Sequence, residues 1–124
     1  MKFRVHGNSI RFRLNRREVE VVRANGHISA IVEFPGGGTL IYSLSSGGAE
    51  MGASFEAGEI RVSVPSEVAN EWTGTDQVAI LERVPVSGGR DLEILIEKDF
   101  QCMHKGEEGK DPDAYPNPMV RPED

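Results

Sequence analysis

Two parts of the chain carry side chains whose types and spacing suit chemistry or ligand binding. The first is Cys102-Met103-His104, which closely follows Asp99. In an extended segment Cys102 and His104 project from the same side, an arrangement that suits two ligands of one transition metal such as zinc. Asp99 and His6 are the further candidate ligands. A metal-binding protein is therefore one hypothesis for this chain.

Two other interpretations of the same segment stay open. Cys102 and His104 also have the chemistry of a nucleophile and its base, although side chains two residues apart seldom reach hydrogen-bonding geometry and no third residue is placed to orient the histidine. Alternatively, Cys102 packs as a small hydrophobic residue beside Phe100, where the last predicted strand ends. We expect the packing role. We therefore predict no catalytic residues, no enzymatic activity and no cofactor other than the transition metal considered above.

The second candidate site is a basic ribbon near the N-terminus. Residues 2–6 and 9–14 alternate strictly between polar and apolar side chains, and Gly7-Asn8 between them is a turn pair, so the pattern predicts a β-hairpin. With a two-residue turn, Arg4 lies opposite Arg11 on one face, and Lys2 lies opposite Arg13. The candidate anion- or partner-binding residues of this ribbon and of the segment after it are Lys2, Arg4, Arg11, Arg13, Arg16 and Arg17.

Like charges directly opposite each other on paired strands destabilise a sheet, so the basic ribbon needs a compensating charge. Acidic side chains on neighbouring strands, such as Glu93 and Glu97, are one source. A bound anion, either nucleic-acid phosphate or an acidic partner protein, is the other. Residues 1–27 carry seven Lys and Arg against two acids, whereas the whole chain has a net charge of −6. This acidic total argues against general affinity for nucleic acid.

The elements that position these side chains follow from periodicity and from the residues at the turns. Asn15 and Glu18 form the capping-box pattern of a helix that ends at Gly26. A second short helix begins at Pro65. Further strands are predicted at residues 28–34, 39–44, 54–55, 60–64, 78–84 and 92–97. We therefore predict a mainly β, α+β fold, with a compact antiparallel sheet or barrel and one or two short helices.

A change in composition divides the chain into a β-rich domain, residues 1–104, and an acidic tail, residues 105–124. The tail holds four prolines and six acids, which favours an extended or disordered segment. Within it Tyr115, Pro116 and Pro118 form a stiff stretch with an aromatic anchor, which suits docking on a groove or sheet edge. We expect the tail to dock on its own domain, where its negative charge complements the basic hairpin; binding to another protein and disorder are the alternatives.

The length of 124 residues suits one domain, and several common classes of site or location are disfavoured. No apolar run is long enough to cross a membrane, and the N-terminus lacks the pattern of a signal peptide. A single cysteine excludes an internal disulfide, so we expect a cytoplasmic protein. The glycine-rich residues 35–38 precede a predicted strand rather than a helix, which excludes a phosphate-binding loop there.

Two stretches of the chain follow one plan. Residues 7–15 align with residues 57–65, and in both an Ile-Arg-apolar-polar-apolar strand leads directly into a helix start. The first stretch resembles the N-terminal module of swapped-hairpin proteins of the AbrB/SpoVT and MazE type, and residues 59–68 are similar to the strand–proline–helix segment of that group. This resemblance implies a pseudo-dimer built from two half-copies, and a DNA-binding regulator that uses the basic hairpin.

The whole chain also resembles a family of short bacterial proteins of unknown function. The shared residues are 5–11, then Glu97-Lys98-Asp99-Phe100 followed by Cys102, and finally Ala114-Tyr115-Pro116-Asn117-Pro118. Because no catalytic or cofactor motif is found, we predict a small binding or regulatory module that acts through protein–protein contacts. The alternatives are an AbrB/MazE-like DNA-binding regulator and a metal-binding protein that uses Cys102 and His104.

Overall fold

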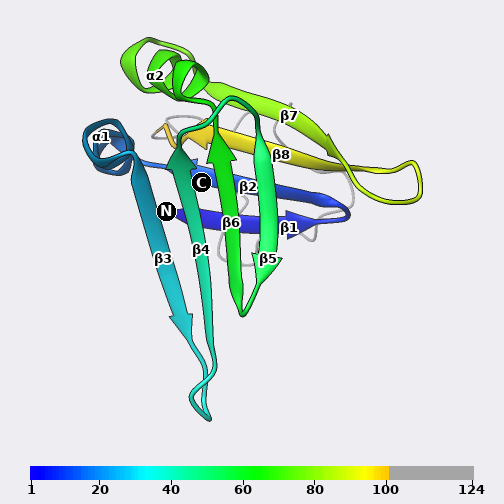
Figure 1. Ribbon diagram of the computed structural model, residues 1–124. Helices are drawn as coiled ribbons and strands as arrows, with labels where there is room; N and C mark the ends of the chain where they lie inside the picture. Colours follow the sequence, from blue (N-terminus) through cyan, green and yellow to red (C-terminus); the bar gives the residue numbers. More distant parts are fainter. Residues whose placement is uncertain (101–124) are drawn as a thin grey trace, which may run out of the picture.

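Two four-stranded β-sheets and two helices make up the computed structural model, which describes residues 1–100 (Figure 1). The predicted mainly β, α+β class is confirmed. Neither helix within this range is long and apolar enough to cross a membrane. The predicted tail lies outside the described residues, as do Cys102, His104, Tyr115, Pro116 and Pro118.

The elements run strand, strand, helix, strand, strand, and this order then repeats. The first half consists of β1 (Lys2–His6), β2 (Ser9–Leu14), α1 (Arg16–Asn25), β3 (His27–Glu33) and β4 (Thr39–Ser46). The second half consists of β5 (Gly52–Glu56), β6 (Glu59–Val64), α2 (Ser66–Gly74), β7 (Ala79–Pro85) and β8 (Asp91–Lys98).

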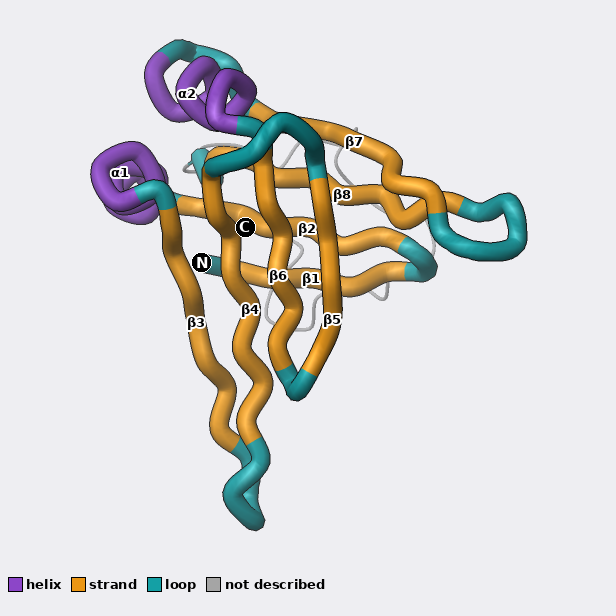
Figure 2. Tube along the Cα trace, in the orientation of Figure 1, coloured by secondary structure: helices purple, strands orange, loops and turns teal. Residues whose placement is uncertain are grey.

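Each sheet combines one hairpin from each half of the chain. The first sheet has the strand order β1-β2-β8-β7 and the second has the order β3-β4-β6-β5. The hairpins are antiparallel, but β2 pairs with β8 and β4 with β6 in parallel. The sheets are therefore mixed, not antiparallel throughout as predicted. They do not close the predicted barrel either; the strands of one sheet run across those of the other (Figure 2).

The strand register confirms the predicted repeat. Lys2 pairs with Arg13 in the first hairpin and Gly52 pairs with Ser63 in the third, so the two hairpins correspond with an offset of 50 residues. This is the offset that aligns residues 7–15 with residues 57–65. The two halves therefore have equivalent positions that can be compared side chain by side chain.

Local hydrogen bonds explain where α1 begins and ends. The Asn15 side chain accepts a hydrogen bond from the Glu18 backbone N–H, and the Glu18 carboxylate accepts one from the Asn15 backbone N–H, both at 2.9 Å. This confirms the predicted capping box. The helix ends at Gly26, whose φ of 72° is the left-handed conformation that glycine adopts without strain. Because Asn15 caps the helix immediately after β2, α1 begins directly where β2 ends.

The core lies between the two sheets and beneath both helices. The central strands supply its fully buried side chains, which include Phe12 and Ile96 in the first sheet and Leu44 and Val62 in the second. Trp72 of α2 closes the core at the helical end. Because side chains alternate along a strand, the inward direction of Phe12 sends its neighbours in β2 to the outer face of the first sheet.

Candidate functional site

The basic hairpin has the predicted geometry. Arg4 lies opposite Arg11, and Lys2 lies opposite Arg13. Phe3 faces Phe12 on the inner side, so all four cations belong to the outer face of the first sheet. The two strands therefore concentrate like charges where each destabilises its cross-strand partner.

Two acidic residues of the second half offset most of this charge. Glu97, which pairs with Arg13 across the parallel β2–β8 ladder, has one carboxylate oxygen 3.0 Å from Nε of Arg13 and 3.2 Å from Nε of Arg11. Asp99, just after β8, lies 3.0 Å from Nζ of Lys2. Neighbouring acids thus match three of the four cations. The other acid considered, Glu93, instead pairs with Arg83 of β7 at 3.2 Å.

Arg4 is the exception in this cluster. It is exposed on β1, and it forms no ion pair with any residue in the range 1–100. Two hollows of the outer face meet at Arg4 and Arg11, with volumes of about 370 and 140 Å³. The larger is lined by Arg4, His6, Ser9, Ile10, Arg11, Glu93 and Leu95. The outer face therefore offers one unmatched guanidinium beside a concave surface.

The inner side of β1 is apolar and only partly covered. The Phe3 ring stacks on Tyr42 of β4 with centroids 5.0 Å apart, and the Tyr42 hydroxyl donates a 3.0 Å hydrogen bond to the Met1 carbonyl oxygen. Beyond this contact the strands of the second sheet continue past β1 (Figure 1). Val32 and Phe55, which lie on the same face as Tyr42, are 39% and 69% exposed.

β1 is also an edge strand of the first sheet, since no strand among the described residues pairs with its outer side. Such an edge presents unpaired backbone N–H and C=O groups that another extended segment can bond. We call this combination the β1 edge site: the free edge of β1, the cation of Arg4, and the exposed apolar side chains of Val5, Val32 and Phe55. Chemically, it suits an extended ligand with an acidic side and an apolar side.

The remaining candidate residues lie elsewhere. Arg16 and Arg17 are exposed in the first turn of α1. The proposed metal ligands Asp99 and His6 are not brought together, because Asp99 pairs with Lys2 and His6 is at the other end of β1, roughly 13 Å away along a strand. Within residues 1–100 no three His, Cys, Asp or Glu side chains form a cluster that would hold a metal ion.

One ionic contact at the start of β1 was not predicted. The N-terminal ammonium of Met1 pairs, in a partly buried position, with the Glu18 carboxylate that also caps α1. Burial raises the pKa of Glu18. Hydrogen bonds from the ammonium and from the Asn15 backbone N–H outweigh this effect and hold the pKa below its ordinary value. This ion pair therefore links the residue before β1 to the first turn of α1.

The exposed apolar residues were also missed, although the repeat offers a signal for two of them. Val5 and Phe55 are equivalent under the offset of 50 residues, and they are 63% and 69% exposed. Alternation places both on the inner faces of their strands. It does not reveal that each strand is an edge whose inner face extends past the opposite sheet.

A protein-family model matches most of the chain. The model described as "Family of unknown function (DUF7009)" matches residues 1–119. The match includes every described residue and continues through Tyr115, Pro116 and Pro118. No curated protein and no solved structure matches the chain.

Proposed function

The chain belongs to DUF7009, a family of unknown function, and from that premise we propose that it is a non-catalytic binding module whose β1 edge site takes up an extended acidic segment of a partner protein. The observation that carries the proposal is Arg4. Its guanidinium has no ion-pair partner within residues 1–100, and it sits on a free strand edge beside exposed apolar surface.

Strand addition explains how the three parts of the site work together. An incoming extended segment forms backbone hydrogen bonds along β1, and its side chains then alternate between the two faces of the enlarged sheet. Acidic side chains on the outer face reach Arg4 and the hollow beside it. Apolar side chains on the inner face cover Val32 and Phe55. The site thus selects a segment in which acidic and apolar residues alternate.

The charges at the site disfavour two other occupants. A second copy of the chain, paired edge to edge through β1, would bring Lys2 and Arg4 of both copies together and be repelled. DNA would meet Glu97 and Asp99 among the cations, and these two carboxylates repel phosphate. The DNA-binding regulator is accordingly the alternative, and the same experiment distinguishes it.

Binding of short fluorescent peptides tests the proposal. One peptide alternates Val with Glu, a second alternates Val with Lys, and a third repeats the Val–Glu sequence with N-methyl groups along one edge. We expect only the first to bind well, with an affinity that falls as salt is raised, since the charges are exposed. The N-methylated peptide should bind weakly because it cannot complete the backbone ladder.

Arg4→Glu should weaken binding of the Val–Glu peptide by about tenfold or more. Arg23→Glu, the same charge change on α1, is the matched control and should leave binding unchanged. Equal affinity for the acidic and basic peptides, or none at low salt, contradicts the proposal. Salt-sensitive binding of duplex DNA that Arg4→Glu abolishes would favour the DNA-binding regulator instead.

A further inference from the structure

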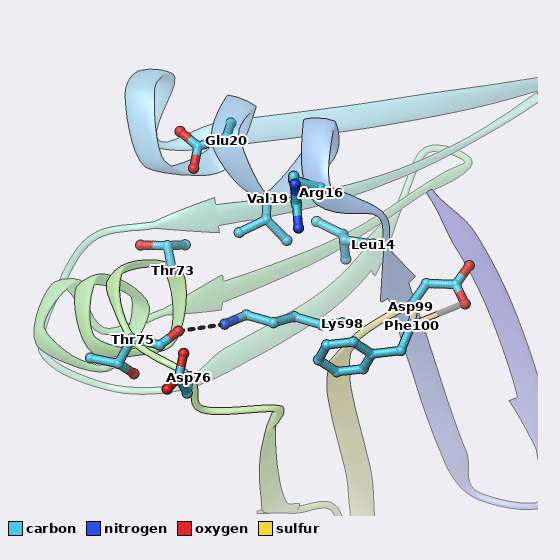
Figure 3. Close-up of a pocket in the computed structure, with 10 residues that line it drawn as sticks. All are labelled: Leu14, Arg16, Val19, Glu20, Thr73, Thr75, Asp76, Lys98, Asp99 and Phe100. Atoms are coloured by element: carbon cyan, nitrogen blue, oxygen red, sulfur yellow. Dashed lines mark hydrogen bonds between the residues drawn. The ribbon is translucent and has the colours of Figure 1, made fainter. Parts of the chain in front are cut away.

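A cavity of about 530 Å³ opens where α1, α2 and the end of β8 meet (Figure 3). Its apolar floor consists of Leu14 and Val19, both buried. Lys98 runs across it and donates a 2.8 Å hydrogen bond to the Thr75 carbonyl oxygen. Phe100, the last described residue, lines the cavity and is 62% exposed. The cavity shares no residue with the β1 edge site, so it is an independent candidate.

Three of the five charged residues that line the cavity form no ion pair within residues 1–100, and one of these, Lys98, is already hydrogen-bonded to Thr75. Glu20 pairs with Arg23 at 4.0 Å, and the Asp99 carboxylate is directed to the hairpin. Arg16 and Asp76 line the cavity and form no ion pair in the described range. An occupant that fits must therefore bring an apolar body for the floor, an acid for Arg16 and a hydrogen-bond donor for Asp76.

We propose that the chain's own residues 113–116, Asp-Ala-Tyr-Pro, occupy this cavity, with the Tyr115 ring on the apolar floor. A tyrosine supplies a large apolar body with a hydroxyl donor at its tip, which suits Asp76. Asp113, two residues earlier, supplies the acid for Arg16. Pro116 limits the conformations that the segment loses on docking, which reduces the entropic cost.

The position where the described chain stops supports this occupant. Phe100 lies at the cavity itself, and the 14 residues 101–114 reach up to about 46 Å when extended. A return to the starting point is therefore well within reach, at a small cost of loop closure. The family match ends at residue 119, so it includes the proposed segment and excludes the last five residues of the chain.

This arrangement places the tail at the helical end of the protein and not on the basic hairpin. There, Lys2, Arg11 and Arg13 already have Glu97 and Asp99 as partners. The β1 edge site therefore stays open for a partner. The proposed function and the tail contact are independent, so an experiment that contradicts one leaves the other untouched.

Fluorine NMR of the full chain labelled with 3-fluorotyrosine tests the contact. The protein has two tyrosines, and Tyr115→Phe assigns the signal of Tyr115. We expect a soluble paramagnetic reagent to relax the Tyr115 signal severalfold more slowly than in the urea-unfolded chain. Arg16→Glu should remove that protection, and Arg16→Glu combined with Asp113→Lys should restore it. Arg17→Glu, a neighbour that does not line the cavity, is the matched control and should retain the protection.

Thermal unfolding gives an independent measurement. Tyr115→Ala should lower the melting temperature, whereas Val120→Ala, outside the family match, should not. Equal paramagnetic relaxation of Tyr115 in the folded and unfolded chain overturns the proposal. So does a protected Tyr115 signal that Arg16→Glu leaves unchanged, because the ring would then be covered elsewhere. A melting temperature that falls for Met103→Ala but not for Tyr115→Ala also overturns it, in favour of the nearer methionine.

Discussion

A single carboxylate oxygen of Glu97 on β8 lies 3.0 Å from Nε of Arg13 on β2 and 3.2 Å from Nε of Arg11 on the same strand. The acid comes from the second half of the chain and the two cations come from the first. The side chain of Glu97 is only 15% exposed, so its charge is less screened by water than that of an ordinary surface acid. This contact makes the basic hairpin compatible with the sheet.

Glu97→Gln should therefore lower the free energy of unfolding by about 1–2 kcal/mol, because it leaves two close guanidinium groups without their shared counter-charge. Urea unfolding measures the change. Glu93→Gln, which removes a partner of the more exposed Arg83, is the control and should cost about 0.5 kcal/mol or less. Equal losses for the two variants would show that Glu97 acts as an ordinary surface charge.

Stability should depend on pH through Glu18. Its pKa is lowered in the folded protein, so the unfolded chain takes up the proton more readily. The contribution of Glu18 is thus fully present above its ordinary pKa of 4.5 and is lost as the pH falls through the lower, folded value. Urea unfolding between neutral and acidic pH should show the gap between the wild type and Glu18→Gln shrinking in acid. Glu20→Gln on the same helix should follow the wild type, and a gap that widens in acid would contradict the assignment.

Substitution of Phe12 should lower the stability of the protein much more than substitution of Phe55. Phe12 is fully buried, so Phe12→Ala should cost about 3–5 kcal/mol of unfolding free energy. Phe55 is 69% exposed, and Phe55→Ser should change stability by about 0.5 kcal/mol or less. The same Phe55→Ser variant should weaken binding of the Val–Glu peptide. If stability falls as much for Phe55 as for Phe12, then Phe55 is covered in solution and does not belong to an open site.

The two hairpin turns predict a stabilising substitution. Ala57 has a φ of 51° and is equivalent to Gly7, whose φ is 56°. A left-handed conformation strains alanine but not glycine. Ala57→Gly should raise the free energy of unfolding by roughly 0.5–1 kcal/mol, and Gly7→Ala should lower it by a similar amount. Thermal unfolding of the pair is the measurement, and a loss of stability in Ala57→Gly would contradict the relief of strain.

The features of the fold that were predicted correctly depend on short-range interactions. The register of the first hairpin follows from its two-residue turn, and the start of α1 follows from the side chains of Asn15 and Glu18. The parallel pairings of β2 with β8 and of β4 with β6 join residues far apart in the chain, and alternation along one strand does not identify its neighbour. The prediction of antiparallel sheets was therefore wrong.

The site was predicted only in part for the same reason. The cations on the hairpin were recognisable from their spacing, but which of them acquire partners depends on the placement of β8. Alternation along β1 places Val5 on the inner face of the strand, but it gives no sign that β1 is an edge strand. Likewise, the cavity beside Lys98 is formed where α1 begins and where α2 and β8 end, and no single segment carries a pattern for it.

The sharing of each sheet between the two halves has a consequence for how the protein is held together. Neither half can form a complete sheet alone, because its two hairpins lie in different sheets and each needs a strand from the other half. A cut in the link between β4 and β5 should therefore leave two fragments interlocked as a non-covalent pair. Separately made fragments should reconstitute the protein on mixing, and two whole chains can also exchange halves to form a domain-swapped dimer.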